Sequence, residues 1–393
     1  MAEIALSVSF FMSVILVILS RGQSHRGEDQ LAVQQRGVRP ASRFGGVAVG
    51  LGLWGALLVL PLAQGQLLLE LILCAMPVFA VGLVADTGRR VTPLWRLAAG
   101  VSSSLLAVIV FGTTVSRIGF APYDAIFAFP VPALFLTAFF LTAASHAFTQ
   151  LEGVHGLCGF ASLITTGALG LIAAQTGQEE TMQVLSVAMA AVGGLLVVNF
   201  PRGLLVLGDA GAYLIGFVTS CIAVKMLQHL PNLSPWAVVL VFFWPLADMV
   251  FAMTRRMGQH KSPFQADRLH FHLLVLRSLE ILMQGKKSGA FSTALTTLIM
   301  LPMMAGPATL GVLFWDQNGK ALALVGLSSI LFVLAYRTIF VTAKQRCLGL
   351  RGAAPKGLHP VPLHQGKPVR RYALSLHEAA SEKCQSRSNP QHP

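Results

Sequence analysis

Two acidic side chains stand where an apolar run meets a polar loop. Asp86 follows shortly after the run that ends at Val84, and Asp209 precedes another run, directly after Gly208. An unpaired carboxylate at the edge of a membrane segment is costly, so such a group indicates a function. Carboxylate oxygens suit Mg2+, which takes one or two carboxylates together with substrate phosphates. Alternatively, Asp209 would cap the helix that follows, and this loop alone favours neither interpretation.

A basic side chain accompanies these acids. Arg43 lies in "PASRFGG", before two glycines and a predicted helix start. A guanidinium matches two phosphate oxygens, and a helix N-terminus favours anions. The alternative is an arginine that only fixes the orientation of the chain in a membrane.

Histidines occupy two further loops. "SPFQADRLHFHLLVL" carries four polar side chains within six residues, Asp267, Arg268, His270 and His272. Arginine and histidine together could hold a diphosphate, although a solvated loop is the alternative. "SHAFTQLEGVHGLCGF" adds Glu152 and His155 between glycines.

The elements that must position these groups are membrane helices. Of 393 residues, 54% are hydrophobic and 11% are charged, whereas about a quarter is charged in soluble domains. We predict an all-α polytopic membrane protein with about eleven spans, since runs of about 18 apolar residues can cross a bilayer. They lie near 4–20, 46–63, 66–84, 95–113, 126–145, 156–175, 181–199, 209–228, 235–253, 289–314 and 320–341.

Lys and Arg gather in the odd-numbered connections, whereas the even-numbered ones hold only Arg117, Lys225 and Lys320. This asymmetry predicts that the odd connections and the C-terminus are cytoplasmic and that the N-terminus is outside. We therefore expect a membrane domain over 1–341 and a basic, disordered cytoplasmic tail over 342–393. The five cysteines show no spacing typical of a metal site.

Polar groups that converge on one membrane face suggest a site for two substrates. One would be a soluble phosphate compound, and the other a lipid whose tail stays in the bilayer. Phosphoryl transfer suits such a site, because its catalysis rests on positioning and charge neutralisation.

The loops resemble those of a known family over roughly residues 36–276. "PASRFGG" is similar to PxPRxGG, and "VGLVADTGRRVTPLWRL" to GxxDDxxxLxPxxRL. "HAFTQLEGVHGLCG" is similar to NAxNxxDGxDGLAxG, "NFPRGLLVLGDAGAYLIGF" to NxPPAxxFxGDxGSxxLGF, and "SPFQADRLHFHLL" to SPFxxDRxHxHHxL. These motifs are typical of polyprenyl-phosphate N-acetylhexosamine-1-phosphate transferases, glycosyltransferase family 4, which include the MraY-type enzymes of peptidoglycan synthesis.

The resemblance implies an enzyme of the bacterial inner membrane. It would transfer N-acetylhexosamine 1-phosphate from UDP-GlcNAc or a related UDP-sugar to undecaprenyl phosphate, release UMP and initiate cell-envelope polysaccharide synthesis. It further implies Mg2+, with Mn2+ as an alternative, membrane lipids around the protein, a homodimer, and no nucleic-acid partner. The implied catalytic residues are Asp86, Asp209 and Glu152, the metal ligands are Asp209 and Asp86, and the substrate-binding residues are Arg43, Asn199, Asp267, Arg268, His270 and His272.

Several positions depart from the family pattern. Ala85 replaces the first aspartate of the pair, and Glu152 and His155 replace the two aspartates of the third motif; the other departures are His146, Thr149, Arg202, Gly203, Ala212 and Leu273. A displacement of about 1 Å can cost about 10²-fold in rate. The alternative is therefore a non-catalytic relative that binds nucleotide sugar or polyprenyl phosphate. A transporter is disfavoured, because the acids cluster at the membrane edge and no inverted repeat is evident.

Overall fold

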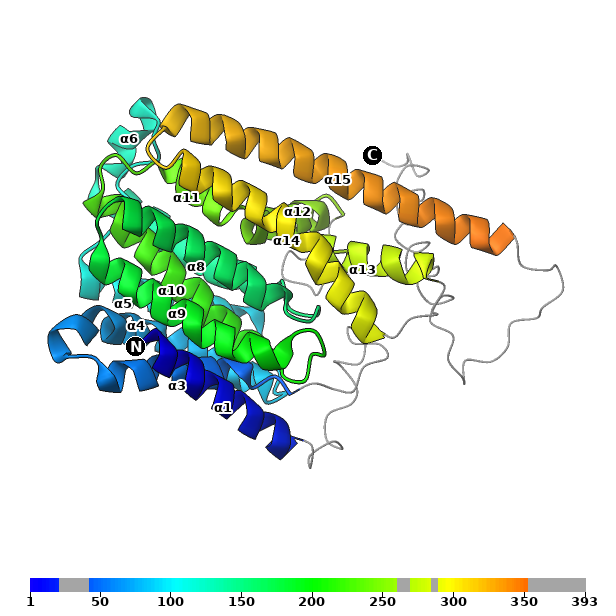
Figure 1. Cartoon of the computed structure of the whole chain (residues 1–393). Helices are drawn as coiled ribbons and strands as arrows, with labels where there is room; N and C mark the ends of the chain where they lie inside the picture. The colour runs from blue at the N-terminus through cyan, green and yellow to red at the C-terminus, as the bar shows by residue number, and fades with distance from the viewer. Residues whose placement is uncertain (21–41, 260–268, 284–288, 353–393) are drawn as a thin grey trace.

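The protein is a bundle of long helices that lie side by side (Figure 1). The computed structural model describes residues 1–20, 42–259, 269–283 and 289–352. In these ranges the all-α prediction is confirmed, and the only β pairing is an isolated bridge between Ser42 and Leu205. The helices are α1 (Ala2–Ser20), α3 (Gly45–Val59), α4 (Leu62–Asp86), α5 (Pro93–Phe111), α6 (Ala121–Phe127), α7 (Pro130–Thr149), α8 (Leu157–Gln175), α9 (Glu179–Asn199), α10 (Gly208–His229), α11 (Pro235–Val241), α12 (Phe243–Met257), α13 (Phe271–Leu282), α14 (Gly289–Leu313) and α15 (Asn318–Gly352).

Membrane-spanning length is confirmed for most of the predicted segments. Within the described ranges, nine helices are long and apolar enough to cross a bilayer, and α11 with α12 forms a tenth candidate bent by 82°. The predicted segment 46–63 forms the shorter helix α3, so a count of eleven spans stays a prediction, as does their orientation. The sequence did not indicate α6 or α13. Helix α15 continues past the predicted domain boundary at 341 to Gly352.

Helix α10 lies in the middle of the bundle, and nearly all of its residues are buried. It packs on α3, α4, α7, α8 and α9. Small residues permit this approach: a Cβ built on Gly82 of α4 would come within 2.6 Å of the Ala210 main chain, and one on Gly46 of α3 would collide with Gly211. The first turn of α10 therefore lies directly against α3 and α4, which carry other parts of the site.

The later helices enclose the bundle on another side, where α15 lies along its edge (Figure 1). An aromatic cluster holds the bent pair there: Trp244 and Phe271 lie 5.0 Å apart between ring centroids, and both contact Phe332 of α15. Tyr336 hydrogen-bonds the Leu269 carbonyl at 3.0 Å. These contacts fix the start of α13, where the two predicted histidines lie.

Candidate functional site

Asp86 lies at the last residue of α4 and binds the N-terminus of α10. Its Oδ1 accepts the Asp209 main-chain N–H at 2.9 Å, and its Oδ2 accepts that of Ala210 at 2.9 Å. The first N–H groups of a helix lack partners inside the helix, and a carboxylate there also gains from the helix dipole. Asp86 thus caps α10 from a distant part of the chain. Of the two interpretations of Asp209, capping by its own side chain is not observed, because no side chain of the N-cap residue bonds to the first turn of α10.

The Asp209 carboxylate lies between two arginines. Arg43 Nη2 is 2.8 Å from Oδ1, and Arg96 Nη1 is 2.8 Å from Oδ2. Arg43 also reaches Asp86, with Nε 3.2 Å from Oδ1. Arg96 is held in turn by a hydrogen bond with the buried Tyr213. The predicted acids Asp86 and Asp209 and the predicted Arg43 therefore form one charged cluster, which Arg96 completes.

Main-chain contacts bring Arg43 to this cluster. Ser42 accepts the Val206 N–H at 2.9 Å, and Gly45 donates to the Val206 carbonyl at 3.0 Å. These bonds join the start of α3 to the loop before α10. Gly208 follows in that loop with a φ of +75°, and its Cα lies so close to Asp86 that a built Cβ would come within 2.6 Å of Oδ2.

Glu152 joins the cluster from the loop between α7 and α8. Its half-buried carboxylate is hydrogen-bonded by the Gly208 main chain and interacts electrostatically with Arg43, Asp86 and Asp209. Burial is the largest cause that raises the pKa of Glu152 to about 7, and Arg43 opposes the rise. Near neutral pH this carboxyl therefore exchanges a proton readily, unlike an exposed glutamate.

The two predicted histidines lie in a second cluster around Asp248 of α12. Asp248 Oδ2 is 2.9 Å from His270 Nδ1 and 3.7 Å from His272 Nδ1, and Oδ1 accepts the Phe271 N–H at 3.0 Å. The His272 ring is fully buried and lies against the Glu152 main chain, and burial lowers the pKa of His272. The Glu152 loop therefore links the two clusters.

His155 and Asn199, by contrast, stabilise a loop rather than face the acids. His155 Nδ1 lies 3.2 Å from the Pro201 carbonyl and 3.0 Å from Thr293 Oγ1 of α14. The side-chain amide of Asn199 donates to the Leu205 carbonyl, and the main-chain carbonyl of Asn199 accepts the Gly203 N–H. Burial lowers the pKa of His155, which favours the neutral ring. Asn199 was predicted to bind substrate, but its amide nitrogen bonds inside this loop.

His155 and Gly203, which both depart from the family pattern, contact one another closely. Gly203 has a φ of +63°, and a built Cβ would collide with the His155 ring. The histidine that replaces an aspartate of the family motif thus occupies the space that an alanine at 203 would need. Two further departures also lie together: His146 packs edge-on against Tyr213 at 5.0 Å, and Thr149 is hydrogen-bonded to it.

Asp267 and Arg268 lie outside the described residues. Sequence reasoning missed Arg96, Asp248 and Tyr213. Asp248 had a signal, because it is a carboxylate inside the apolar segment 235–253, and such a residue marks a functional position by default. Arg96 also had a signal, because it lies within "VGLVADTGRRVTPLWRL", the segment that is similar to a motif of the family.

The carboxylates in this arrangement do not fit a metal ion. Both oxygens of Asp86 accept main-chain N–H groups, and both oxygens of Asp209 pair with arginines. Within the described part of the chain, no three histidine, cysteine or acidic side chains are grouped as metal ligands. Asp86 and Asp209 as metal ligands therefore stay a prediction from the sequence.

Part of the chain is similar in sequence to known proteins. Residues 68–227, which include Asp86, Arg96, Glu152 and Asp209, match the profile of a family described as glycosyl transferase family 4. The chain is 34% identical over 149 residues to the undecaprenyl-phosphate alpha-N-acetylglucosaminyl 1-phosphate transferase of Escherichia coli (strain K12), a match that covers 37% of this chain and 41% of the relative. The protein of the same name from Yersinia pestis is 32% identical over 148 residues, or 36% of this chain and 40% of the relative.

A more distant match is longer. The decaprenyl-phosphate N-acetylglucosaminephosphotransferase of Mycobacterium tuberculosis (strain CDC 1551 / Oshkosh) is 26% identical over 269 residues, which covers 61% of this chain and 66% of the relative. The chain thus spans about two fifths of the length of the E. coli and Yersinia relatives that it matches.

Proposed function

We propose that this chain, whose residues 68–227 match the profile of glycosyl transferase family 4, transfers a sugar phosphate to a membrane lipid. The donor is a UDP-N-acetylhexosamine such as UDP-GlcNAc, the acceptor is undecaprenyl phosphate, and the leaving group is UMP. The single observation that carries this proposal is the cluster of Arg43, Arg96, Asp86 and Asp209 at one end of a bundle of membrane helices.

The location of this cluster suits the two substrates. Acidic and basic side chains meet where α4 ends and α10 begins, at an edge between apolar spans and polar loops. A nucleotide sugar can reach such an edge from water, while a polyprenyl tail stays in the bilayer. We place this edge at the cytoplasmic face of a bacterial inner membrane, and we expect a homodimer.

The reaction exchanges one phosphorus–oxygen bond for another. An oxygen of the lipid phosphate attacks the β-phosphorus of the UDP-sugar, a P–O bond forms to the lipid, and the bond to UMP breaks. Arg43 and Arg96 are the groups that would bind the diphosphate, because planar guanidinium groups hold two phosphate oxygens at once. Asp209 positions both arginines before the substrate arrives, and Asp86 fixes the helix start beneath them.

Glu152 is the side chain suited to accept a proton from the lipid phosphate. A lipid phosphate is already largely ionised near neutral pH, since a second phosphate pKa lies near 6. The remaining fraction can transfer its proton to Glu152, whose pKa of about 7 makes it a stronger base than an ordinary glutamate. Glu152 can thus act as the base in a chain in which Ala85 has replaced the first aspartate of the pair.

Divalent metal dependence is general in this family. Because the carboxylates here are bonded to arginines and main-chain N–H groups, no step of the proposed reaction is routed through a metal. Dependence on Mg2+ or Mn2+ stays a prediction from the family resemblance.

The test is UMP release by the purified full chain from UDP-GlcNAc, undecaprenyl phosphate and Mg2+. We expect release by the wild type and its loss in Asp209→Asn, which removes the charge between the two arginines. Arg89→Gln is the matched control, because Arg89 is exposed on the loop after α4 and should retain activity. Absence of UMP release across a panel of UDP-sugars would overturn the proposal.

A non-catalytic binding protein is the second candidate function. Two observations favour it: Ala85 stands beside Asp86, and the acids already have partners. This candidate predicts that UDP-GlcNAc binds in equilibrium titration while no UMP appears. It is excluded if the wild type turns over and Asp209→Asn does not.

A further inference from the structure

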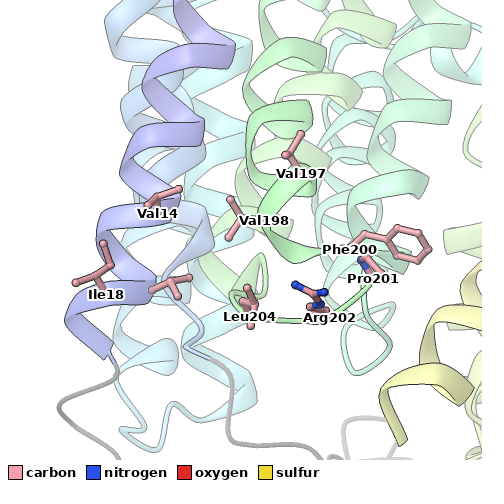
Figure 2. Close-up of a pocket in the computed structure, with 9 residues that line it drawn as sticks. Val14, Ile18, Val197, Val198, Phe200, Pro201, Arg202 and Leu204 are labelled. Atoms are coloured by element: carbon pink, nitrogen blue, oxygen red, sulfur yellow. The ribbon is translucent and has the colours of Figure 1, made fainter. Parts of the chain in front are cut away.

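An open groove lies between α1, α9 and the loop that precedes α10. Its volume is about 540 Å3, and its walls include Val14 and Ile18 of α1 and Val197 and Val198 of α9. Figure 2 shows these side chains along the two helices, with Arg202 and Leu204 on the loop at one end. None of the acids of the charged cluster lines this groove.

The apolar walls face outward from the bundle. Ile18 is 62% exposed and Val197 is 66% exposed, and both belong to helices of membrane-spanning length. Exposed apolar side chains on such helices contact lipid chains, because no water is available in the hydrocarbon region. A hydrocarbon chain is therefore the occupant that fits the apolar walls of the groove.

Among the described residues that line the groove, Arg202 is the only charged one. Arg202 is exposed, and within the part of the chain that the structure describes its guanidinium has no hydrogen-bond or ion-pair partner. Arg202 is also one of the departures from the family pattern, which has proline there. The position has thus gained a charge at the edge of the membrane, where arginine attracts anionic lipid headgroups.

The loop that carries Arg202 is held by several hydrogen bonds. Asn199 bonds to both Gly203 and Leu205, and His155 bonds to the Pro201 carbonyl from the opposite side. Val206 is tied to Ser42 by a further main-chain hydrogen bond of 2.9 Å. The guanidinium is therefore presented from a fixed backbone, which lowers the entropy lost when a ligand binds.

From these features we propose that the groove is a binding site for an anionic phospholipid of the bilayer. The phosphodiester lies at Arg202, and one hydrocarbon chain lies between α1 and α9. The occupant is not the reacting acceptor, because a reacting phosphate must reach the charged cluster and no residue of that cluster lines the groove. One arginine also matches the single charge of a phosphodiester.

The experiment measures retained lipid on the purified full chain by native mass spectrometry. The protein is reconstituted in equal amounts of phosphatidylglycerol and phosphatidylcholine, with no nucleotide sugar present. We expect the wild type to retain phosphatidylglycerol preferentially and Arg202→Gln to lose about fivefold of that preference, as expected for one arginine near the surface. Arg89→Gln, an exposed arginine outside the groove, should behave as the wild type.

A second variant tests the hydrocarbon part of the site. Val197→Trp fills the groove from an exposed position and should reduce retention of both lipids, with an unchanged helical circular dichroism spectrum. Equal lipid preference in the wild type and Arg202→Gln would overturn the proposal, as would unchanged retention in Val197→Trp. Displacement of phosphatidylglycerol by undecaprenyl phosphate at equal concentration would also overturn it, in favour of an acceptor site. Since no turnover is measured, failure here leaves the proposed transferase function untouched.

Discussion

Asp86 and Asp209 share Arg43 as a partner but differ in their other contacts. Asp86 also accepts two main-chain N–H groups of α10, whereas Asp209 also pairs with the side chain of Arg96. The sequence indicated that both acids matter, because both stand at membrane edges. It did not indicate that the two acids have different contacts, because the main-chain partners of Asp86 lie more than a hundred residues away in the sequence and no local pattern records them.

Asp86→Asn tests the capping role. An amide oxygen can accept only one of the two N–H groups, and the amide nitrogen would face the other donor. We expect a loss of about 1–3 kcal/mol in the free energy of unfolding. Thermal unfolding in detergent checks this value. Thr87→Ala, which changes an exposed neighbour, should change stability by less than about 0.5 kcal/mol. Equal stabilities for Asp86→Asn and the wild type would contradict the capping role.

Glu152 makes stability depend on pH. Its pKa rises from 4.5 to about 7 on folding, so folding favours the protonated form. The resulting stabilisation is fully present below about pH 4.5 and is lost as the pH rises through about 7. Glu152→Gln stays neutral and should therefore be more stable than the wild type at pH 8, by on the order of 3 kcal/mol.

The measurement is chemical unfolding of both proteins between pH 5 and pH 8. The difference between them should grow with pH and level off above the pKa of Glu152. A difference that is constant over this range would show that the carboxyl does not titrate there.

His155 and Gly203 should show coupled stabilities. Gly203→Ala adds a Cβ that collides with the His155 ring at a φ of +63°. Gly177→Ala is the matched control, because its φ is +69° and its built Cβ meets nothing within 4 Å. We expect Gly203→Ala to cost more than the control, and His155→Ala to recover at least about 1 kcal/mol of the difference in a double-mutant cycle. Additive effects of the two substitutions would contradict the coupling.

At the scale of elements, the apolar segments predicted most of the helices well, because each run is long and bounded by polar loops. The bend between α11 and α12 and the short helix α13 were not predicted. Segment 235–253 is apolar apart from Asp248 and was predicted as one span, yet the chain bends by 82° there. Asp248 and Trp244 of α12 contact His270 and Phe271 at the start of α13. These are contacts between distant segments, which hydropathy does not contain.

The start of α10 is the element on which the site depends. Gly208 has a φ of +75°, and a Cβ there would collide with the Arg43 carbonyl and lie 2.6 Å from Asp86. Gly208→Ala should therefore abolish UMP release and lower the melting temperature. Gly112→Ala shares a positive φ of +60° with open space around it, so it isolates the backbone cost, which is about 1 kcal/mol. Similar losses in both variants would show that the contact with Asp86 is unimportant.

At the scale of the whole molecule, charge asymmetry predicts the orientation. Loops that carry the charged cluster should face the cytoplasm, and α6 should face outward. Single cysteines at Thr87 and Tyr123, which are both exposed, test this prediction in a cysteine-free background. A membrane-impermeant maleimide should label Tyr123→Cys in intact spheroplasts and Thr87→Cys only in inverted vesicles. The reverse pattern would invert the predicted topology.

The central place of α10 has a consequence for biogenesis. Its packing partners α3, α4, α7, α8 and α9 are all synthesised before it. When α10 leaves the ribosome, the walls around it have therefore already been made, and its polar first turn can enter an interior that carries Asp86 and both arginines. A membrane segment that begins with glycine and a carboxylate is a poor candidate for insertion alone. We expect α10 to insert into the membrane efficiently when the preceding helices have been synthesised first, and poorly when it is expressed as an isolated segment.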